Sequence, residues 1–257
     1  MITSLANPQV KHIAQLMKKS RYRRECKQYI AEGERLVLEI PLQMLEKVYI
    51  SESAAYKGFW QEWLEGKPYE VFSDHVFGEL SQTQTPQGIM AVVKMAESDP
   101  KEMLQGSRYL LLENLQDPGN LGTIIRTAEG AGMDGVFLSR TCVDIYNPKV
   151  VRSTMGAIYR VPFAYIHRFT DLIQLLKNQG IRIYGAAVED AKDCFEADLS
   201  GRCGVLIGNE ANGLSEETLS LVDGRLKIPM AGELESLNAA MAAGILMYEM
   251  RRQQVRK

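Results

Sequence analysis

The spacing of apolar residues changes along the first hundred residues of the chain. Val10, Ile13 and Leu16 recur at helical spacing and would share one face of a helix. Asn7-Pro8 supplies an N-cap and a proline at the first helical position, so this helix is predicted over residues 7–19. Further on, Val and Ile gather in short runs that are typical of strands. Residues 1–96 are therefore predicted to form an α/β domain, with a second helix over 33–40 and strands over 47–50, 70–72 and 89–94.

Continuous apolar runs separated by helical stretches cover the rest of the chain. The run Tyr109-Leu110-Leu111-Leu112 has the character of a strand buried on both faces. The polar stretch 97–107 contains Pro100 and shows no periodicity, so it is predicted to be a linker. Residues 108–257 are therefore predicted to form an α/β domain with a mostly parallel sheet. The predicted strands are 109–112, 136–138, 181–187 and 203–207, and the predicted helices are 121–130, 171–179 and 237–252.

The composition is that of a soluble globular protein, because 46% of the 257 residues are hydrophobic and 24% are charged. No run of about 18 apolar residues is present, and the N-terminus lacks the apolar stretch of a signal peptide. A cytoplasmic protein without a membrane span is therefore predicted. The four cysteines form no C-x-x-C pair and the three histidines are dispersed, which argues against a metal site and against an activated nucleophile.

Basic residues are concentrated near the N-terminus, although the net charge of the chain is −2. Lys and Arg side chains that follow a phosphate backbone release its counterions, so this stretch predicts an RNA-contacting patch. A solvated helix face is the equally weighted alternative. Tyr22 and Tyr29 lie among these charges and could stack on unpaired bases. The predicted RNA-contacting residues of this stretch are Lys11, Lys18, Arg21, Arg23 and Arg24.

Three turns rich in Gly, Pro and Asn join a predicted strand to a predicted helix, at residues 117–126, 207–214 and 228–238. Ligands of α/β sheets bind outside the carboxyl ends of the strands, so the three turns predict one composite site. In the first turn, Arg126 has apolar neighbours and falls more than one turn inside the predicted helix. An arginine in such surroundings is typically the partner of a carboxylate or a phosphate.

The stretch Gly130-Ala131-Gly132-Met133-Asp134-Gly135 fits the G-x-G-x-x-G pattern of dinucleotide-binding proteins. In those proteins the pattern follows a strand and opens a helix. Here it ends a predicted helix and leads into a predicted strand, so a helix C-cap and a turn are the better interpretation. This placement disfavours a nucleotide-dependent oxidoreductase.

The three turns, in order and wording, resemble the SpoU/TrmH family of RNA ribose 2′-O-methyltransferases, a class IV family of the SPOUT superfamily. The resemblance extends from about Arg108 to the last helix. It implies a deep trefoil knot in the C-terminal domain, S-adenosylmethionine as cofactor and a homodimer. Residues 7–11, 29–33 and 85–89 also resemble the small ribosomal-protein-like, RNA-recruiting domain that many family members carry.

The resemblance also implies roles for individual residues. Arg152, in the stretch 148–157, would contact RNA, with an ordinary strand-and-turn element as the alternative for that stretch. Arg126 would grip a phosphate and stabilise negative charge on the ribose oxygen, because a guanidinium stays protonated and is no simple base. A phosphate oxygen or a water could then accept the proton. The implied catalytic residues are Asn120, Arg126, Glu210, Ser236 and Asn238, and the implied cofactor-binding residues are Gly208, Ile228, Met230 and Leu237.

The reaction so predicted is transfer of a methyl group from S-adenosylmethionine to a ribose 2′-hydroxyl, without a metal. Ribosomal RNA is the preferred substrate because a recruiting domain is attached, and transfer RNA is the alternative. A non-catalytic RNA-binding protein that retains the fold is a further alternative, although binding alone does not require Asn120, Arg126, Ser236 and Asn238 together.

Overall fold

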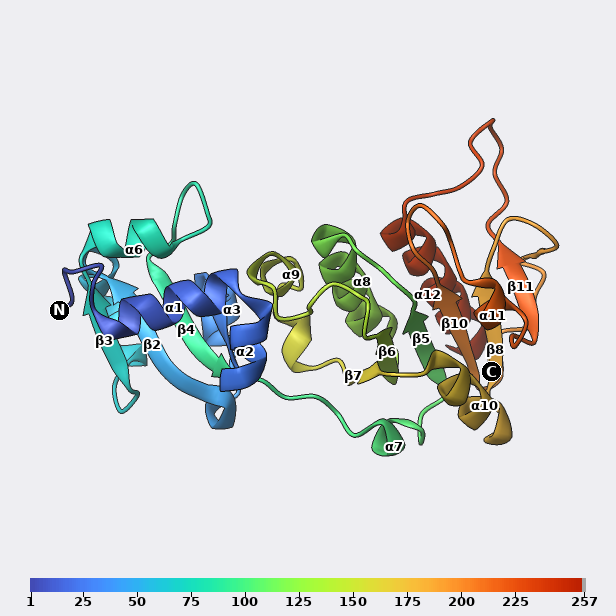
Figure 1. Ribbon diagram of the computed structural model, residues 1–257, viewed down its shortest axis with the longest axis horizontal. Helices are drawn as coiled ribbons and strands as arrows, with labels where there is room; N and C mark the ends of the chain where they lie inside the picture. The colour runs from blue at the N-terminus through green and yellow to red at the C-terminus, as the bar shows by residue number, and fades with distance from the viewer. Residues whose placement is uncertain (256–257) are drawn as a thin grey trace. The chain divides into compact units, whose positions relative to one another are not determined.

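The computed structural model describes residues 1–255, and these residues fold into two compact units (Figure 1). The first unit consists of residues 1–96 together with 144–159, and the second consists of residues 97–143 together with the chain from Arg160 onward. A segment from the second half of the chain thus belongs to the first unit. Within residues 1–255, no helix is long and apolar enough to cross a membrane.

A four-stranded mixed sheet organises the first unit, with strand order β1-β4-β2-β3. β4 runs antiparallel to both of its neighbours, whereas β2 and β3 are parallel. The strands are β1 (Gln28–Glu32), β2 (Leu45–Ser51), β3 (Tyr69–Phe72) and β4 (Ile89–Lys94), and the helical elements are α1 (Pro8–Lys18), α2 (Ser20–Cys26), α3 (Glu34–Leu38), the 3-10 turn η1 (Leu42–Met44), α4 (Glu52–Ala55), α5 (Gly58–Trp63) and α6 (Asp74–Leu80).

The first helix forms as its sequence predicts. The Asn7 side chain accepts a hydrogen bond from the backbone N–H of Gln9 at 2.8 Å, and Pro8 is the first helical residue. The apolar face of α1 packs with α6 against the sheet, and Ile13 and Leu16 are completely buried there. Burial of each such side chain contributes roughly 1.5–3 kcal/mol, so this face holds α1 on the sheet.

The segment 144–159 is helical and packs against β1 in the first unit. It contains α9 (Pro148–Ser153), which begins after the N-cap Asn147, and the 3-10 turn η2 (Ala157–Tyr159). The strand-and-turn alternative for residues 148–157 is therefore wrong, because Asn147-Pro148 starts a helix. The rings of Tyr146 and Tyr29 lie 4.7 Å apart, and the Tyr146 hydroxyl donates to the carbonyl of Ala96 at 2.6 Å.

The second unit contains a seven-stranded sheet in the order β7-β6-β5-β10-β8-β11-β9, and all of its strand pairs are parallel. The predicted parallel α/β domain is confirmed. The strands are β5 (Arg108–Leu112), β6 (Gly135–Ser139), β7 (Phe163–Ile166), β8 (Arg182–Ala186), β9 (Lys192–Asp193), β10 (Cys203–Ile207) and β11 (Gly224–Lys227), and the helices are α7 (Pro100–Met103), α8 (Pro118–Ala131), α10 (Phe169–Asn178), α11 (Glu216–Leu219) and α12 (Ala239–Val255).

Helices explain why the central strands are apolar throughout. α10 packs against the sheet face that carries Tyr109, Leu111 and Phe137. α8 and α12 pack against each other, and α12 also contacts β10. Thr127 of α8 reaches to 3.6 Å from the position that a Cβ of Gly244 would take, so the small residues of α12 admit a close helix neighbour. Tyr109–Leu112 are fully buried as a result.

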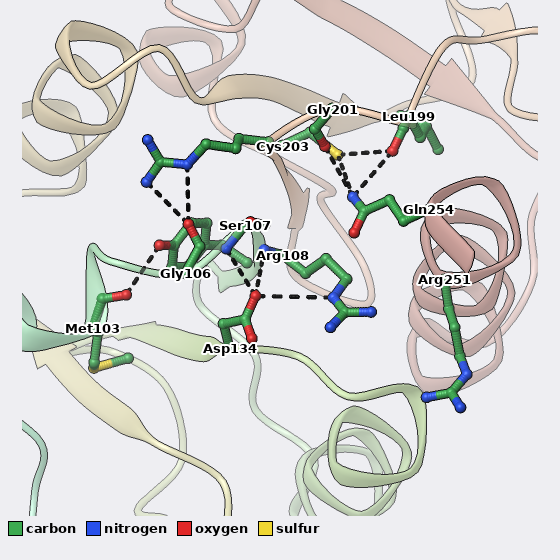
Figure 2. A network of polar contacts seen from close by, with 12 residues as sticks. Met103, Gly106, Ser107, Arg108, Asp134, Leu199, Gly201, Cys203, Arg251 and Gln254 are labelled. Atoms are coloured by element: carbon green, nitrogen blue, oxygen red, sulfur yellow. Dashed lines mark hydrogen bonds and ion pairs between the residues drawn. The ribbon is translucent and has the colours of Figure 1, made fainter. Parts of the chain in front are cut away.

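Polar contacts anchor the amino end of the sheet (Figure 2). Oδ2 of Asp134 accepts hydrogen bonds from the backbone N–H groups of Ser107 and Arg108 at 2.8 and 2.9 Å, where β5 begins. Gln254, near the end of α12, donates to the carbonyl of Gly201 at 2.9 Å, just before β10. These contacts satisfy backbone groups at one edge of the sheet and leave the opposite, carboxyl edge for the three polar turns.

Two expectations about helix ends have opposite outcomes. α8 ends at Ala131, and Gly132 follows with a φ of +69°, so the helix C-cap interpretation of the glycine pattern is confirmed. α12 begins at Ala239, two residues later than predicted. Ser236 is also of a residue type that favours the N-cap position, but it makes no hydrogen bond with a described residue of this helix. Oδ1 of Asn238 accepts from the backbone N–H of Ala240 at 2.9 Å instead, because asparagine is as good an N-cap as serine.

Candidate active site

The three polar turns leave the sheet at its carboxyl edge, within the second unit. β5 and β10 are neighbours, with Leu112 opposite Ile207, so the loops that follow them emerge side by side. The loop after β5 leads into α8, and the loop after β11 leads through residues 228–238 into α12. Since parallel strands share their carboxyl edge, the fold directs all three turns to one end of the sheet.

A chain of side-chain hydrogen bonds connects the three turns. Nδ2 of Asn120 donates to Oε1 of Glu210 at 3.0 Å, and Nδ2 of Asn238 donates to Oδ1 of Asn120 at 2.9 Å. The backbone N–H groups of Gln116 and Asp117 also donate to the Glu210 carboxylate, at 3.2 and 3.1 Å. One predicted site residue from each turn therefore takes part in a single polar cluster, which we call the Glu210–Asn120–Asn238 cluster.

The side-chain amides of Asn120 and Asn238 can each adopt only one orientation in this cluster. The Glu210 carboxylate fixes the first, and the backbone N–H groups at the start of α12 fix the second. An ionised carboxylate only accepts hydrogen bonds, so Asn120 must turn its NH2 group toward Glu210 and its oxygen toward Asn238. At the other end, Oδ1 of Asn238 accepts the N–H groups of Ala240 and Met241 at the start of α12. Nδ2 of Asn238 must therefore face Asn120, and the donors of the cluster point in fixed directions.

The Glu210 carboxyl group is held in its charged form. Burial raises its pKa, but hydrogen bonds from the Asn120 side chain and from the backbone of Asp117 and Gln116 outweigh burial, so the pKa lies below the ordinary glutamate value. A carboxylate with a lowered pKa and several hydrogen-bond donors is a weak base. The geometry thus makes Glu210 a residue that orients Asn120 rather than one that removes a proton.

The second turn is a tight loop that explains Gly208. Asn209 and Gly213 exchange two backbone hydrogen bonds of 2.9 Å, so the chain folds back on itself. A Cβ on Gly208 would lie 2.2 Å from the backbone carbon of Gly213, a distance that no side chain tolerates. The close backbone approach that requires glycine here is made by the loop itself, and Oδ1 of Asn209 holds the loop by accepting from Ala211 N–H at 2.9 Å.

The segment 228–237 has the chemistry that the adenosine part of a cofactor requires. Ile228, Met230 and Leu237 are half-buried apolar side chains on it. None of its backbone N–H and C=O groups finds a hydrogen-bond partner among the described residues. Free backbone donors and acceptors beside apolar side chains suit a planar base and a ribose, so the residues fit S-adenosylmethionine.

Two of the predicted catalytic residues lie apart from the cluster. Arg126 follows Asn120 by six positions on α8, which is about 9 Å along the helix axis and about 120° around it. Its guanidinium is exposed and has no ion pair or hydrogen bond among residues 1–255. Ser236 is exposed in the loop before α12 and likewise makes no hydrogen bond with a described residue. Both side chains are therefore available to a substrate.

Sequence comparison decides what kind of protein carries this site. Residues 107–248 match the SpoU rRNA Methylase family, and residues 7–91 match the MRM3-like substrate binding domain. The chain belongs to the SpoU rRNA Methylase family.

Two curated relatives extend the match along nearly the whole chain. The 23S rRNA (guanosine(2553)-2′-O)-methyltransferase RlmP of Bacillus subtilis is 32% identical over 252 residues, which cover 97% of this chain and 98% of that protein. An uncharacterized tRNA/rRNA methyltransferase of Synechocystis is 33% identical over 98% of this chain and 94% of its own length.

Solved structures of similar proteins contain the cofactor. The AdoMet-bound rRNA methyltransferase from Sinorhizobium meliloti has a TM-score of 0.84 at 30% identity, covering 98% of this chain and 97% of that one. AviRb from Streptomyces viridochromogenes, in complex with AdoMet, has a TM-score of 0.87 at 26% identity, covering 97% and 98%. This SpoU family member is an RNA 2′-O-methyltransferase that uses S-adenosylmethionine. The non-catalytic and oxidoreductase alternatives are set aside.

The predicted RNA-contacting residues of this SpoU protein differ in exposure. Lys11, Lys18, Arg21 and Arg24 are exposed on α1 and α2, and Arg152 is half-buried on α9 of the same unit. Arg23 is only 3% exposed, and its guanidinium donates to Oδ2 of Asp144 at 2.6 Å and to the carbonyl of Leu16 at 2.7 Å.

The expectation that Arg23 contacts RNA does not fit this burial, because its guanidinium already donates to Asp144 and Leu16 inside the protein. Tyr29 is also fully buried and cannot stack on a base, whereas Tyr22 is half-buried, with its hydroxyl 2.9 Å from Nδ1 of His12. Neither burial is visible in the sequence, since both depend on residues more than a hundred positions away.

Two polar residues of the site, Asn114 and Gln116, were not predicted from the sequence. Asn114 adopts a φ of +57°, and its carbonyl accepts from the side chains of Gln116 and Asn209 at 3.2 and 2.9 Å. Gln116 also donates from its side chain to the carbonyl of Thr141 at 2.6 Å. These contacts fix the loop that presents its N–H groups to Glu210. The signal was the polar run Glu113-Asn114 directly after an apolar strand, three residues before the first turn.

Proposed function

We propose that this SpoU enzyme methylates a ribose 2′-hydroxyl of ribosomal RNA. The main structural support is the Glu210–Asn120–Asn238 cluster, in which the amide donors of Asn120 and Asn238 have fixed directions. The cluster lies next in the chain to the segment 228–237, whose residues fit the cofactor. The Bacillus subtilis relative is named for 23S rRNA, and it matches this chain over both units. The match of residues 7–91 to the MRM3-like substrate binding domain supports recruitment of the RNA by the first unit.

The residues divide the work of positioning. When bound, S-adenosylmethionine supplies an activated methyl group on its sulfonium. Gly208, Ile228, Met230 and Leu237 line the cofactor loops and exclude water there. Asn120 and Asn238 hold the target ribose through their remaining amide N–H groups, with Glu210 fixing their orientation. Alignment of the reacting atoms supplies much of the rate enhancement in such a transfer.

The hydroxyl proton needs an acceptor, and neither charged residue of the site provides one. Glu210 has a lowered pKa, and the Arg126 guanidinium stays protonated. We assign Arg126 to a phosphate of the target nucleotide and to stabilisation of negative charge on the ribose oxygen. Ser236 contacts the same ribose. The proton passes to a phosphate oxygen or to a water.

The first unit recruits the RNA. Exposed Lys11, Lys18, Arg21 and Arg24, with Arg152, provide phosphate contacts, and Arg23 is left out of the patch because it is buried. In this proposal residues 1–96 form the recruiting domain, 97–107 the linker and 108–257 the catalytic domain with its trefoil knot. The segment 144–159 of the catalytic domain packs within the first unit, and residues 97–107 pack within the second. We place the enzyme in the cytoplasm.

A homodimer is part of the proposal. Met241 and Tyr248 lie seven residues apart on one face of α12, and they are 59% and 51% exposed. A second copy of the chain would cover them. Light scattering coupled to gel filtration measures the mass, and a species of the mass of one chain at micromolar concentration would contradict a stable dimer.

The test is methyl transfer to defined RNAs. Purified protein is incubated with unmodified ribosomal RNA or transfer RNA and with methyl-labelled S-adenosylmethionine, and the products are digested to nucleosides for mass spectrometry. A 2′-O-methylated nucleoside from ribosomal RNA, absent with Arg126→Ala, supports the proposal. Transfer to transfer RNA alone would replace ribosomal RNA by the alternative substrate, which the tRNA/rRNA name of the Synechocystis relative keeps open.

A further inference from the structure

A polar cavity opens at the carboxyl edge of the same sheet, beside the Glu210–Asn120–Asn238 cluster, and the proposed function does not use it. Its volume is about 300 Å³, at the lower end of cavities that bind small ligands. Asn114 and Ser139 line it where β5 and β6 end, and His167 and Arg168 line it between β7 and α10. Glu217 of α11 forms the facing wall. All of these residues belong to the second unit.

The two sides of the cavity carry opposite charge. Arg168 is exposed, and its ion pair with Asp171 spans 3.4 Å between side chains that are 75% and 59% exposed. Such a pair contributes little, so Arg168 can exchange Asp171 for a phosphate at small cost. His167 is exposed beside it, and Phe169 begins α10 without a side-chain cap. This side therefore offers hydrogen-bond donors and positive charge to an anion.

The facing side offers acceptors. Glu113 is 8% exposed, and its carboxylate already accepts from Ser215 N–H, Ser215 Oγ and Thr218 Oγ1 at 2.9, 2.8 and 2.7 Å. Glu113 therefore lines the cavity, but its carboxylate already has hydrogen-bond donors within the protein. Glu217 is exposed, and its carboxylate has no hydrogen-bond donor or ion pair among the described residues. Glu217 is therefore free to accept N–H groups from a ligand.

The cavity is joined to the active site through one short loop. Asn114 lines the cavity, and two residues later the N–H of Gln116 donates to Glu210 at 3.2 Å. Two Cα steps span at most about 7.6 Å. The Gln116 side chain ties the two places together, because it donates to the carbonyls of Asn114 and Thr141 at 3.2 and 2.6 Å. Neighbouring nucleotides of one strand can reach both.

We propose that this cavity binds an unpaired nucleotide of the substrate RNA, adjacent to the nucleotide that is methylated. This assignment rests on the proposed function. The phosphate lies at Arg168 and His167, and the base edge lies at Glu217. A carboxylate selects base edges that carry N–H donors, and guanine presents two adjacent donors on its Watson–Crick edge. The nucleotide must be unpaired, because pairing would occupy that edge.

Kinetics with matched variants test the role in methyl transfer. Arg168→Ala and Glu217→Gln are compared with Lys192→Ala, which removes an exposed charge of the second unit outside the cavity. We expect each cavity variant to raise the KM for RNA about tenfold. We also expect an unchanged dissociation constant for S-adenosylmethionine, and the Lys192→Ala enzyme to behave as wild type. An unchanged KM in both cavity variants overturns the proposal.

A binding measurement separates this proposal from the proposed function. The chain has three histidines, so the ring signals of His167 can be assigned in an NMR spectrum with His167→Gln. Guanosine 5′-monophosphate should shift the His167 signal at lower concentration than uridine 5′-monophosphate, and Glu217→Gln should abolish the difference. No shift with either nucleotide, or the same shift with inorganic phosphate alone, overturns the nucleotide site. If wild-type protein methylates no RNA while guanosine 5′-monophosphate still shifts His167, the proposed function fails and nucleotide binding stands.

Discussion

Asn238 donates a hydrogen bond to Asn120 at 2.9 Å although 118 residues separate them along the chain. The contact joins the loop before the last helix to the first turn of α8. Asn238 also caps α12 through its other side-chain atom, so one residue supports both the helix and the active site. The position of the Asn120 amide, which we propose to contact the target ribose, is thereby coupled to the start of α12.

Asn238→Asp should separate these two roles. A carboxylate retains the N-cap and adds negative charge at the start of α12, which is favourable. The substitution also replaces the Nδ2 donor by a carboxylate oxygen, which would face Oδ1 of Asn120, so that two acceptors meet. A flip of the Asn120 amide would not help, because its oxygen would then face the Glu210 carboxylate. We expect methyl transfer to fall at least about tenfold, with a thermal midpoint close to that of wild type.

Asn238→Ala is the companion variant, because it removes the cap as well and should cost about 1 kcal/mol of stability. Turnover and differential scanning calorimetry on both variants check the prediction. Normal turnover by Asn238→Asp would show that the Asn120 contact is dispensable.

Glu210 should make stability depend on acid pH. Its folded-state pKa is lowered, so its contribution to stability is fully present above the unfolded-state value and is lost as the pH falls through the folded-state value. The difference in unfolding free energy between wild type and Glu210→Gln should be constant near neutral pH and should shrink below about pH 4.5. Urea titrations at a series of pH values measure it. A difference that stays constant down to pH 3 would rule out this role.

The sequence predicted the parallel sheet because buried parallel strands are apolar on both faces, as in Tyr109–Leu112. It predicted the cluster because polar residues directly after such strands must share the carboxyl edge. It could not predict the burial of Arg23, because the partner of Arg23 is Asp144, which lies 121 positions further along the chain. The helix at 148–153 does carry a local signal, the N-cap Asn147 followed by Pro148, as at the start of α1. Local pattern also misplaced the start of α12, where Ser236 and Asn238 are both acceptable caps.

Gly208→Ala should disrupt the loop after β10. The added methyl group would lie 2.2 Å from the backbone of Gly213, so the loop must open or shift. We expect loss of measurable S-adenosylmethionine binding by calorimetry. Gly78→Ala is the matched control, because a Cβ there meets nothing within 4 Å and alanine favours the helix α6. Equal cofactor binding by Gly208→Ala and wild type would contradict the tight-loop account.

The cysteines should differ in reactivity. Burial raises the pKa of Cys194 and of Cys203 to about 11, and it also raises the pKa of Cys142. Cys26 is the half-exposed thiol. At pH 8 a thiol reagent should label about one cysteine per chain rapidly in the native protein, and Cys26→Ser should remove that phase. Rapid labelling of more than one thiol would mean that the second unit opens readily.

Arg23 and Arg24 are adjacent in sequence and should behave oppositely. Arg23→Ala leaves Asp144 without its buried partner and should cost about 3–5 kcal/mol of stability. Arg24 is exposed, so Arg24→Ala should change stability by less than about 0.5 kcal/mol. The logarithm of the RNA-binding constant falls linearly with the logarithm of the salt concentration, and we call the steepness of this line the salt slope. If Arg24 contacts a phosphate, Arg24→Ala should reduce the salt slope by about one. The double variant Arg23→Met with Asp144→Leu should recover most of the lost stability, because apolar side chains leave no unpaired charge. An unaltered salt slope for Arg24→Ala would move the RNA-binding patch away from α2, since the helix would then present a solvated face only.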